Sequence, residues 1–383
     1  MVVEEPLQSL PDAKASNIFL ANPSDIELEA IYRLSFAEWG DSLSLAQYLE
    51  ESRFLTNVPL AKDDGMTTWI LTSRNRLPNQ RPLLASCETF RKRALFTNQR
   101  GQMYEGLIYG IASVFVNPLY RRRGYTTRLM HELSKMLPTL PFGSERPLGS
   151  ILYSDIGKDF YAKRGWSSSL PVNHHIEFEP LLRPLHPKAR LIQNEDLQQL
   201  CHDDEIISQE SVAKMPSGRA RLMIVPDVDH ILWHHNKETF ACERLFGRDP
   251  QAKGAIAGEH GSRIWVVWVR RYYNHPECSP EDNTLYILRL VIEDQDPSSG
   301  QLEAQAQNLR AVMQAARAEA ANWNLQSVKL WHPTRLAQEL LELSGLEYQQ
   351  VQREEDAIAS LRWFGEEKED TIEWLACEKY AWV

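Results

Sequence analysis

The chain has 383 residues and a mass of 44.2 kDa, more than one compact hydrophobic core usually spans, so the length predicts two domains. Its 43% hydrophobic and 25% charged residues, with a mean hydropathy of -0.42, exclude collagen-like and largely disordered chains. A formal net charge of -10 argues against a general nucleic-acid binder, because such a protein needs Lys and Arg to neutralise phosphates.

Membrane and disulfide-stabilised proteins are also disfavoured. The sequence has no run of about 18 apolar residues, the length of a membrane-spanning helix, and its start lacks a basic segment followed by an apolar one. The five cysteines are far apart and never form a C-x-x-C pair, which is typical of reduced thiols. We therefore expect a soluble, cytoplasmic protein without a membrane partner, and the sequence leaves its oligomeric state open.

Strands and helices alternate along the first 180 residues. Residues 17–21 predict a strand, and Ser24 and Asp25 supply cap chemistry for the helix that follows. Three strand-like runs come next, and a polar loop between the last two predicts an antiparallel meander: residues 67–72, 82–90 and 106–116. Helix and strand then alternate over residues 125–137, 149–153, 157–164 and 173–178.

The second half repeats this order after a proline-rich stretch, residues 179–190, that predicts a linker. The helices predicted beyond it are 195–213, 230–246, a long amphipathic one around 302–323 and a short one at 334–345. The strands predicted there are 263–270, 285–292 and 327–331, followed by two terminal strand-like runs. Strand pair, long helix, strand, short helix and strand echo residues 82–178, which indicates a second domain built like the first.

The segment VFVNPLYRRRGYTTRLM, residues 114–130, carries the most specific chemistry. A strand that ends, turns through a glycine and enters a helix presents successive backbone N–H groups at the positive end of the helix. Such an arrangement binds a pyrophosphate without a metal ion. Three arginines before Gly124 add positive charge, although a basic turn exposed to solvent would look the same.

This segment resembles the acetyl-CoA loop of the GCN5-related N-acetyltransferases (GNAT), whose pattern is Arg or Gln, two residues, Gly, one residue, then Gly or Ala. Here the last position is Thr126, a departure that predicts a slightly more open loop. In the family the strand before the loop separates from its neighbour, and its backbone contacts pantetheine and polarises the thioester carbonyl. The resemblance thus implies acetyl-CoA as co-substrate, no metal, and these binding residues: Val114, Phe115, Val116, Arg121, Arg122, Arg123, Gly124, Tyr125, Thr126 and Thr127.

A second segment, SDIGKDFYAKRGW at residues 154–166, resembles a later motif of the same family. In that resemblance Tyr161 is the general acid that protonates the departing CoA thiolate, and Ser154 stands beside the pantetheine arm. The alternative for Tyr161 is a packing role on an amphipathic helix. Because both motifs occur in the family's order, we favour the catalytic interpretation.

The general base is less certain from sequence. An alkylammonium with a pKa of about 10.4 must lose a proton before its nitrogen can attack a thioester. Related enzymes often place a Glu on the strand before the loop, but Gly110 and Ile111 occupy that stretch here. Glu88, in an otherwise apolar strand, is our first candidate, and an outward-facing charge is the alternative. The other candidates that stay open are His174, His175, the terminal carboxylate of Val383 and water.

Other catalytic signatures are weak or missing. His230 and His234 form a helical i, i+4 pair, but the Glu of a zinc protease motif is absent, so we expect surface histidines and no metal site. No G-x-S-x-G segment is present, which disfavours a serine hydrolase.

Taken whole, the chain resembles the fungal lysine N-epsilon acetyltransferases of the GNAT superfamily. The resemblance implies an α/β (α+β) GNAT fold, with a mixed, mostly antiparallel sheet flanked by helices, then a second, degenerate GNAT-like domain. We expect a catalytic domain over residues 1–180, a linker over 181–192 and a C-terminal domain without the CoA loop over 193–383. The expected activity is acetyl transfer to the side-chain amine of free L-lysine. Alternatives are polyamines, other small amines or protein lysines as acceptors, or a non-catalytic CoA-sensing or interaction protein.

Overall fold

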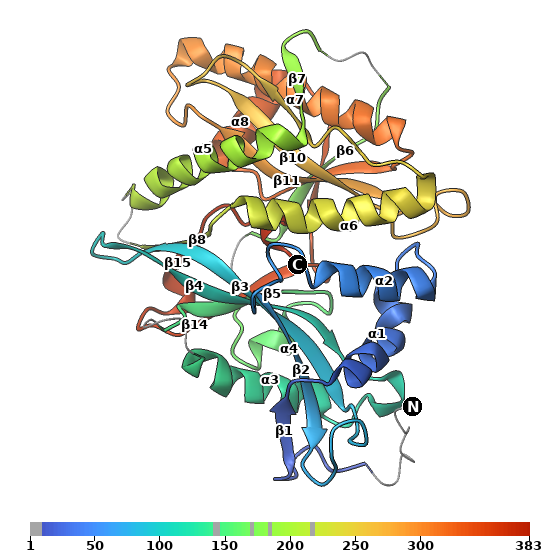
Figure 1. Cartoon of the computed structure of the whole chain (residues 1–383). Helices are drawn as coiled ribbons and strands as arrows, with labels where there is room; N and C mark the ends of the chain where they lie inside the picture. Colours follow the sequence, from blue (N-terminus) through green and yellow to red (C-terminus); the bar gives the residue numbers. More distant parts are fainter. Residues whose placement is uncertain (1–9, 141–145, 169–171, 183–185, 215–218) are drawn as a thin grey trace.

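The computed structural model describes residues 10–140, 146–168, 172–182, 186–214 and 219–383, and it forms two layers stacked along the long axis of the molecule (Figure 1). The elements up to the expected linker are β1 (Ile18–Ala21), α1 (Asp25–Trp39), α2 (Leu45–Leu55), β2 (Met66–Ser73), β3 (Ala85–Thr97), β4 (Met103–Phe115), α3 (Tyr125–Met136), β5 (Gly149–Ser154), α4 (Asp159–Ala162) and β6 (His174–Phe178).

The remaining elements begin inside that expected linker. They are β7 (Ala189–Ile192), α5 (Asn194–Ala213), β8 (Ala220–Ile224), α6 (Val228–Phe246), β9 (Gly254–Ala257), β10 (Ile264–Arg271), β11 (Thr284–Ile292), α7 (Ser299–Asn322), β12 (Ser327–Trp331), α8 (Arg335–Ser344), β13 (Gln349–Gln352), β14 (Ile358–Trp363) and β15 (Ile372–Trp374). The strand β7 pairs with β9, so the end of this stretch is part of a sheet. Residues 183–185 of the same stretch lie outside the described residues.

Two mixed, mostly antiparallel sheets confirm the predicted fold class. The first has the order β1-β2-β3-β4-β5-β14, with β8 added to β3 and β15 to β8. The second has the order β13-β6-β12-β11-β10-β9-β7. Each contains an antiparallel pair, a helix and a parallel strand in the same succession: β3, β4, α3 and β5 in the first, and β10, β11, α7 and β12 in the second. The repeated order expected from the sequence is therefore present.

The two halves of the chain exchange strands. The strand β14 comes from the second half and pairs antiparallel with β5, whereas β6 comes from the first half and pairs antiparallel with β12. Each exchanged strand thus takes the corresponding place in the other sheet. Because β8 and β15 also join the first sheet, both sheets are built from both halves. The division into domains of residues 1–180 and 193–383 stays a prediction.

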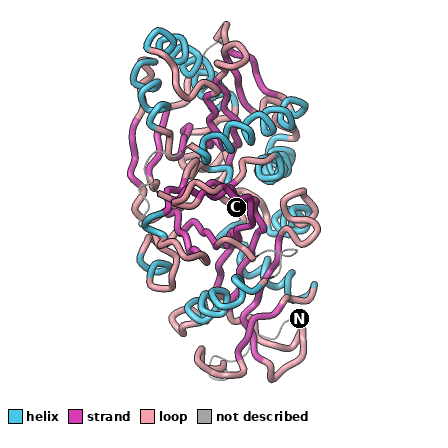
Figure 2. The backbone as a smooth tube through the Cα atoms, turned by 90° about the vertical axis from the view of Figure 1, so that its left-hand side faces the viewer, coloured by secondary structure: helices cyan, strands magenta, loops and turns pink. Residues whose placement is uncertain are grey.

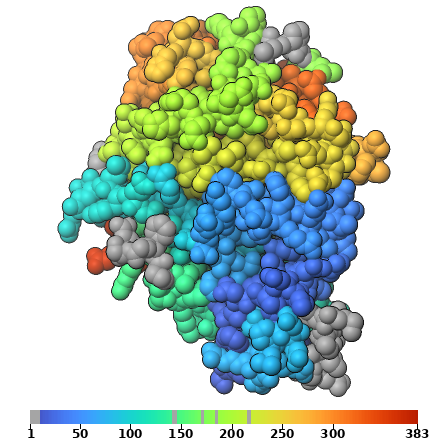
Figure 3. Space-filling model, viewed as in Figure 1, coloured from blue at the N-terminus to red at the C-terminus, as the bar shows by residue number. Residues whose placement is uncertain are grey.

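Helix α6 and the C-terminal segment lie between the two layers. Figure 1 and Figure 2 both place the C-terminus at mid-height, in the middle of the molecule. The buried cluster there joins side chains of α5, β8 and β14 to inward-facing side chains of β10 and β11, such as Trp265 and Leu288. On the face shown in Figure 3, the blue helical region of α1 and α2 abuts the yellow helix α6. The two layers therefore share one hydrophobic core and do not meet at a solvated interface.

Most predicted elements are confirmed, and the misses have local reasons. Helix α2 was not predicted, although Ser44 and Gln47 form a capping box at its start, a signal that the sequence does carry. The strands β7, β8 and β9 are only four or five residues long and were also missed. Among the described residues, no helix is both long enough and apolar enough to cross a membrane.

Candidate active site

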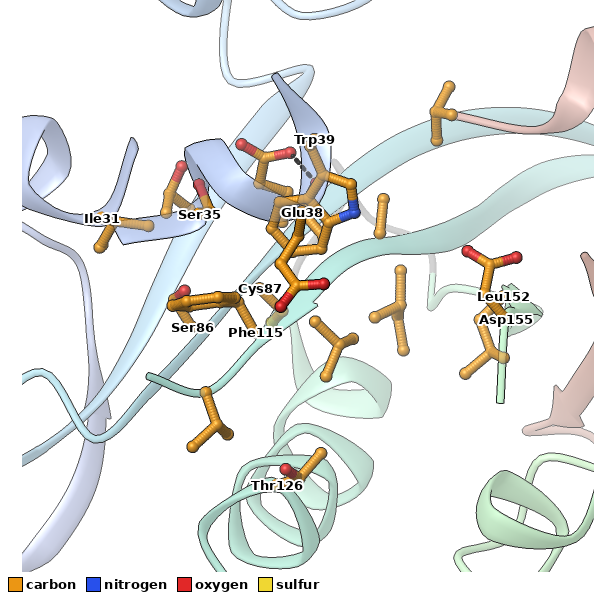
Figure 4. A pocket seen from close by; sticks show the side chains of 18 of the residues that line it. Ile31, Ser35, Glu38, Trp39, Ser86, Cys87, Phe115, Thr126, Leu152 and Asp155 are labelled. Carbon is orange, nitrogen blue, oxygen red and sulfur yellow. Dashed lines mark hydrogen bonds between the residues drawn. The ribbon is translucent and has the colours of Figure 1, made fainter. Parts of the chain in front are cut away.

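A cavity of about 780 Å³ lies between the two halves of the chain and is lined by side chains from both. The first half contributes residues of α1 to α4 and of β2 to β5, and the second contributes α6, the end of β10, Trp382 and Val383. Figure 4 shows Glu38 and Trp39 of α1 on one side of this space, with Thr126 of α3 and Asp155 on others. One cavity therefore brings distant segments of the chain together.

The strands β4 and β5 part at this cavity. They pair in parallel as far as Ile111, and the described part of β5 offers no partner to residues 112–115 of β4. A bulge accompanies the separation: Ser113 has a φ of 52°, and the register between β3 and β4 shifts at the same level. Separated strands leave backbone N–H and C=O groups free to pair with the amide groups of a ligand. The geometry matches the strand separation that the resemblance implied.

The basic loop forms the start of α3. Gly124 is the N-cap residue, with a φ of 85° and no side-chain cap, so the first-turn N–H groups are left to other acceptors. Arg122 also has a positive φ, 64°, and Arg121 pairs with Glu38 at 2.5 Å. The loop therefore combines an uncapped helix N-terminus with positive side chains, which is the arrangement that suits a pyrophosphate.

The expected CoA-binding residues fall into two groups. Those that line the cavity are Val114, Phe115, Val116, Arg121, Arg122, Gly124, Tyr125, Thr126 and Thr127. Arg123 and Ser154 do not line it. The Ser154 hydroxyl donates to the carbonyl of Gly157 at 2.7 Å and accepts from the N–H of Ile156 at 3.2 Å, so it holds the turn before α4. Tyr125 also has a structural bond, because its hydroxyl donates to the carbonyl of Pro11 at 2.7 Å.

Replacing Gly124 by Asp is expected to weaken acetyl-CoA binding by about 10- to 100-fold, because a carboxylate would face the pyrophosphate and a Cβ would strain the positive φ. A Cβ at Gly124 would also come 3.4 Å from the Cβ of Ala13. Calorimetric titration with acetyl-CoA measures the effect. Gly247→Asp is the matched control. Gly247 has a φ of 64° at the end of α6 and open space around it, so this variant has the same backbone strain at a site away from the basic loop. Equal affinities of Gly124→Asp and the wild type would contradict the assignment of this loop.

Tyr161 lies in α4 and lines the cavity, with its ring in the hydrophobic cluster beneath α3. No described residue makes a hydrogen bond to its hydroxyl, which leaves that group for a ligand. Burial raises the pKa of Tyr161, and the nearby Asp155 carboxylate raises it further. The phenol thus keeps its proton throughout the neutral range, as a general acid must before it protonates a leaving group.

Glu88 lies in β3 and also lines the cavity. Its Oε2 accepts a hydrogen bond from Ser113 at 2.7 Å, and its Oε1 has no hydrogen-bond partner in the described chain. Burial raises the pKa of the Glu88 carboxyl, while the Ser113 hydroxyl and the charge of Lys237 oppose part of this rise. A carboxyl with a raised pKa is a stronger base than an exposed one, so this environment suits proton removal.

Comparison with known families decides what kind of protein carries this site. The family described as the LYC1 GNAT-like C-terminal domain matches residues 175–383, more than half of the chain. The chain belongs to the LYC1-like GNAT family. The match begins within β6, the strand that pairs in the second sheet. Membership of this superfamily implies an acyl-CoA as co-substrate.

Relatives of the LYC1-like chain are distant. It is 21% identical to a lysine acetyltransferase of Yarrowia lipolytica over 287 residues, which cover 64% of this chain and 70% of that protein. A GCN5-related N-acetyltransferase from Kribbella flavida has a TM-score of 0.50 and 14% identity, covering 90% of this chain and 71% of its own. Saccharomyces cerevisiae N-myristoyltransferase has a TM-score of 0.51 and 10% identity, covering 94% and 82%. These solved structures show a shared fold, the GNAT-like fold that the sequence predicts.

Two of the open candidates for the base lie away from the cavity of this LYC1-like protein. His174 and His175 belong to β6 in the second sheet, and neither lines the cavity. His174 contacts His332, and His175 lies 3.4 Å from Glu177. Of the side chains and termini proposed from the sequence as the general base, Glu88 and Val383 are the ones that line the cavity.

The expectation that the histidines of α6 lie at the surface is wrong. All three are buried and each has a polar partner: Asp227 for His230, the Tyr380 carbonyl for His234, and the Trp268 carbonyl for His235. The reason is the position of α6 between the layers, where faces that an isolated helix would expose are covered. Within the described ranges, no cluster of His, Cys, Asp or Glu is arranged to hold a metal ion.

Several cavity residues could not be found from the sequence. Trp233, Lys237 and Arg271 come from the second half of the LYC1-like chain, and Glu51 comes from the helix that was not predicted. No motif marks these residues, because they reach the same cavity as the basic loop only through the packing of the second half against the first. These charged and aromatic side chains of the cavity are therefore candidates for recognising the amine.

Proposed function

We propose that the protein transfers an acetyl group from acetyl-CoA to a primary amine, and that this amine is the side-chain amine of free L-lysine. The observation that carries the proposal is the single cavity lined by the start of α3, Tyr161 and Glu88 at the point where β4 and β5 part. The 21% identity with a protein named lysine acetyltransferase supports lysine as the acceptor.

The first step is removal of a proton from the acceptor's ammonium group. Glu88 accepts this proton on Oε1, the oxygen that Ser113 does not occupy. Its raised pKa makes the transfer less unfavourable than transfer to an exposed carboxylate. The product of this step is a neutral amine with a lone pair directed at the thioester.

The second step is attack of the amine nitrogen on the thioester carbonyl carbon, which places negative charge on the carbonyl oxygen. A backbone N–H of residues 112–115, on the side of β4 that β5 no longer pairs with, stabilises this oxyanion as the charge develops. The nitrogen of the tetrahedral intermediate loses its second proton to water. The C–S bond then breaks, and Tyr161 donates its phenolic proton to the CoA thiolate. The acetylated amine and CoA thiol leave, and solvent exchange returns a proton to Tyr161 and removes one from Glu88.

The test is acetyl-CoA turnover with a panel of acceptors, followed by thiol release and by mass analysis of the products. The panel contains free amino acids, polyamines and a lysine-containing peptide, and a parallel series varies the acyl chain of the CoA ester. We expect acetyl transfer to the side chain of lysine above the other acceptors. Thermal stabilisation by acetyl-CoA without any turnover would contradict an enzymatic role and favour a CoA sensor.

A further inference from the structure

Two pairs of opposite charges lie in the cavity wall where the two halves of the chain meet. Lys237 of α6 lies 2.8 Å from Glu51 of α2, and Arg271 at the end of β10 lies 2.5 Å from Asp41. In each pair the cation comes from the second half and the carboxylate from the first. Lys237, Arg271 and Glu51 line the main cavity, and all four residues line a small adjoining cavity of about 30 Å³.

This charged wall and Glu88 line the same cavity. The positive charge of Lys237 acts on the Glu88 carboxyl, so the two groups are within electrostatic range of each other. Tyr48 of α2 lines the same space, and its hydroxyl is 3.1 Å from the hydroxyl of Ser35. The wall and Glu88 are therefore both accessible to one acceptor bound in this cavity.

The cations in the wall have hydrogen-bonding capacity left over. The side chain of Arg271 has Asp41 as its one carboxylate partner among the described residues, and its buried Nε has no hydrogen-bond partner there. A guanidinium has five N–H donors and an ammonium has three, so one carboxylate each does not use them all. A ligand carboxylate that leaves water needs such charged donors, because an unpaired buried charge is costly.

Resting on the proposed function, we propose that Lys237 and Arg271 bind the α-carboxylate of the acceptor, with Glu51 supplying the matching charge for its α-ammonium. The acceptor is therefore an amino acid. A polyamine has no carboxylate for these two cations and brings further positive charge to them. Side-chain acetylation follows from the same geometry, since anchoring the α-carbon at the wall directs the far amine to Glu88.

The test compares lysine with lysinamide, in which the carboxylate is replaced by a neutral amide and the rest of the molecule is kept. For the wild type, kcat/KM with lysine should exceed that with lysinamide by about 10- to 100-fold, the range expected for charged hydrogen bonds to one carboxylate. In Lys237→Gln this ratio should fall by about tenfold or more, mainly through a higher KM for lysine. Gln is chosen because its amide can still donate to Glu51.

Arg271→Gln is the second variant and should lower the same ratio. Arg271→Gln also breaks the ion pair with Asp41, which can destabilise the fold. The result for Lys237→Gln is therefore sufficient by itself to decide the proposal. Arg244→Met is the matched control: Arg244 of α6 pairs with Glu50 of α2 at 2.8 Å outside the cavity, so it loosens the same helix contact without touching the wall. Its ratio of lysine to lysinamide should equal that of the wild type.

The outcomes separate the two proposals. Equal use of lysine and lysinamide by the wild type, or an unchanged ratio in Lys237→Gln with normal folding, would overturn the carboxylate site and leave acetyl transfer standing. A fall of the ratio in Arg244→Met as large as in Lys237→Gln would also overturn it. Failure to acetylate any amine would overturn the proposed function and this inference with it.

Discussion

Glu88→Gln is expected to lower kcat/KM for the amine by about 10²- to 10⁴-fold, the usual contribution of a general base. Gln keeps the size of the side chain and its acceptor for Ser113, so folding and acetyl-CoA affinity should change little. The measurement is steady-state kinetics with lysine at saturating acetyl-CoA. Glu105→Gln is the control, because Glu105 on the neighbouring strand is exposed and pairs with Arg93 instead of facing the cavity.

The pH profile identifies the base more directly than the loss of rate. Burial raises the pKa of Glu88, and a base is active only when ionised, so kcat/KM of the wild type should fall as the pH drops through that raised value. Ser113→Ala removes a hydrogen bond that favours the ionised form and should move this fall to higher pH. An acid limb that persists at the same pH in Glu88→Gln would assign the base to another group.

Tyr161→Phe is expected to lower kcat by about 10²- to 10⁴-fold near neutral pH, while acetyl-CoA affinity stays close to that of the wild type. The ring that packs in the cluster beneath α3 is retained, and the hydroxyl that would protonate the thiolate is lost. Pre-steady-state acetyl transfer measures the chemical step directly. Tyr109→Phe is the control. Tyr109 belongs to the same hydrophobic cluster but does not line the cavity, so loss of its hydroxyl should leave the rate unchanged.

An unchanged rate in Tyr161→Phe, with chemistry shown to be rate-limiting, would make Tyr161 a packing residue. A second readout uses the leaving group. An acyl ester of a more acidic thiol needs less help to depart, so Tyr161→Phe should lose less activity with such a donor than with acetyl-CoA. Equal losses with both donors would point to a structural defect in α4.

The parts of the site that could be predicted from the sequence are contiguous. The strand, the loop and the start of α3 form one segment around Gly124, and Tyr161 lies in a second short segment, so local pattern is enough to place them. Glu88 could only be guessed, because the face of a strand follows from its register and a bulge shifts the register of β3 at this level. Lys237 and Arg271 could not be found, because nothing in their local sequence shows that they face a cavity.

The order of strands in the two sheets could not be predicted from the sequence either. Consecutive strands usually pair or lie close together, which assigns β6 to the first sheet and β14 to the second. The structure does the opposite with both strands. The helical periodicity of α6 likewise indicates a helix with an exposed side, and packing between two layers overrides it. The sequence pattern of a segment indicates which secondary structure it forms. It does not indicate which distant segment packs against it.

The strand exchange has a consequence for how the protein is made in the cell. During synthesis β5 emerges from the ribosome about 200 residues before its partner β14, and β6 emerges well before β12. The nascent chain therefore holds two unpaired strand edges for many seconds at the usual rate of translation. A ribosome that stalls after the start of α3 releases a fragment with open edges, which is a substrate for chaperones and proteases. The first sheet, and with it the wall of the cavity, is thus complete only when the last strands have been added.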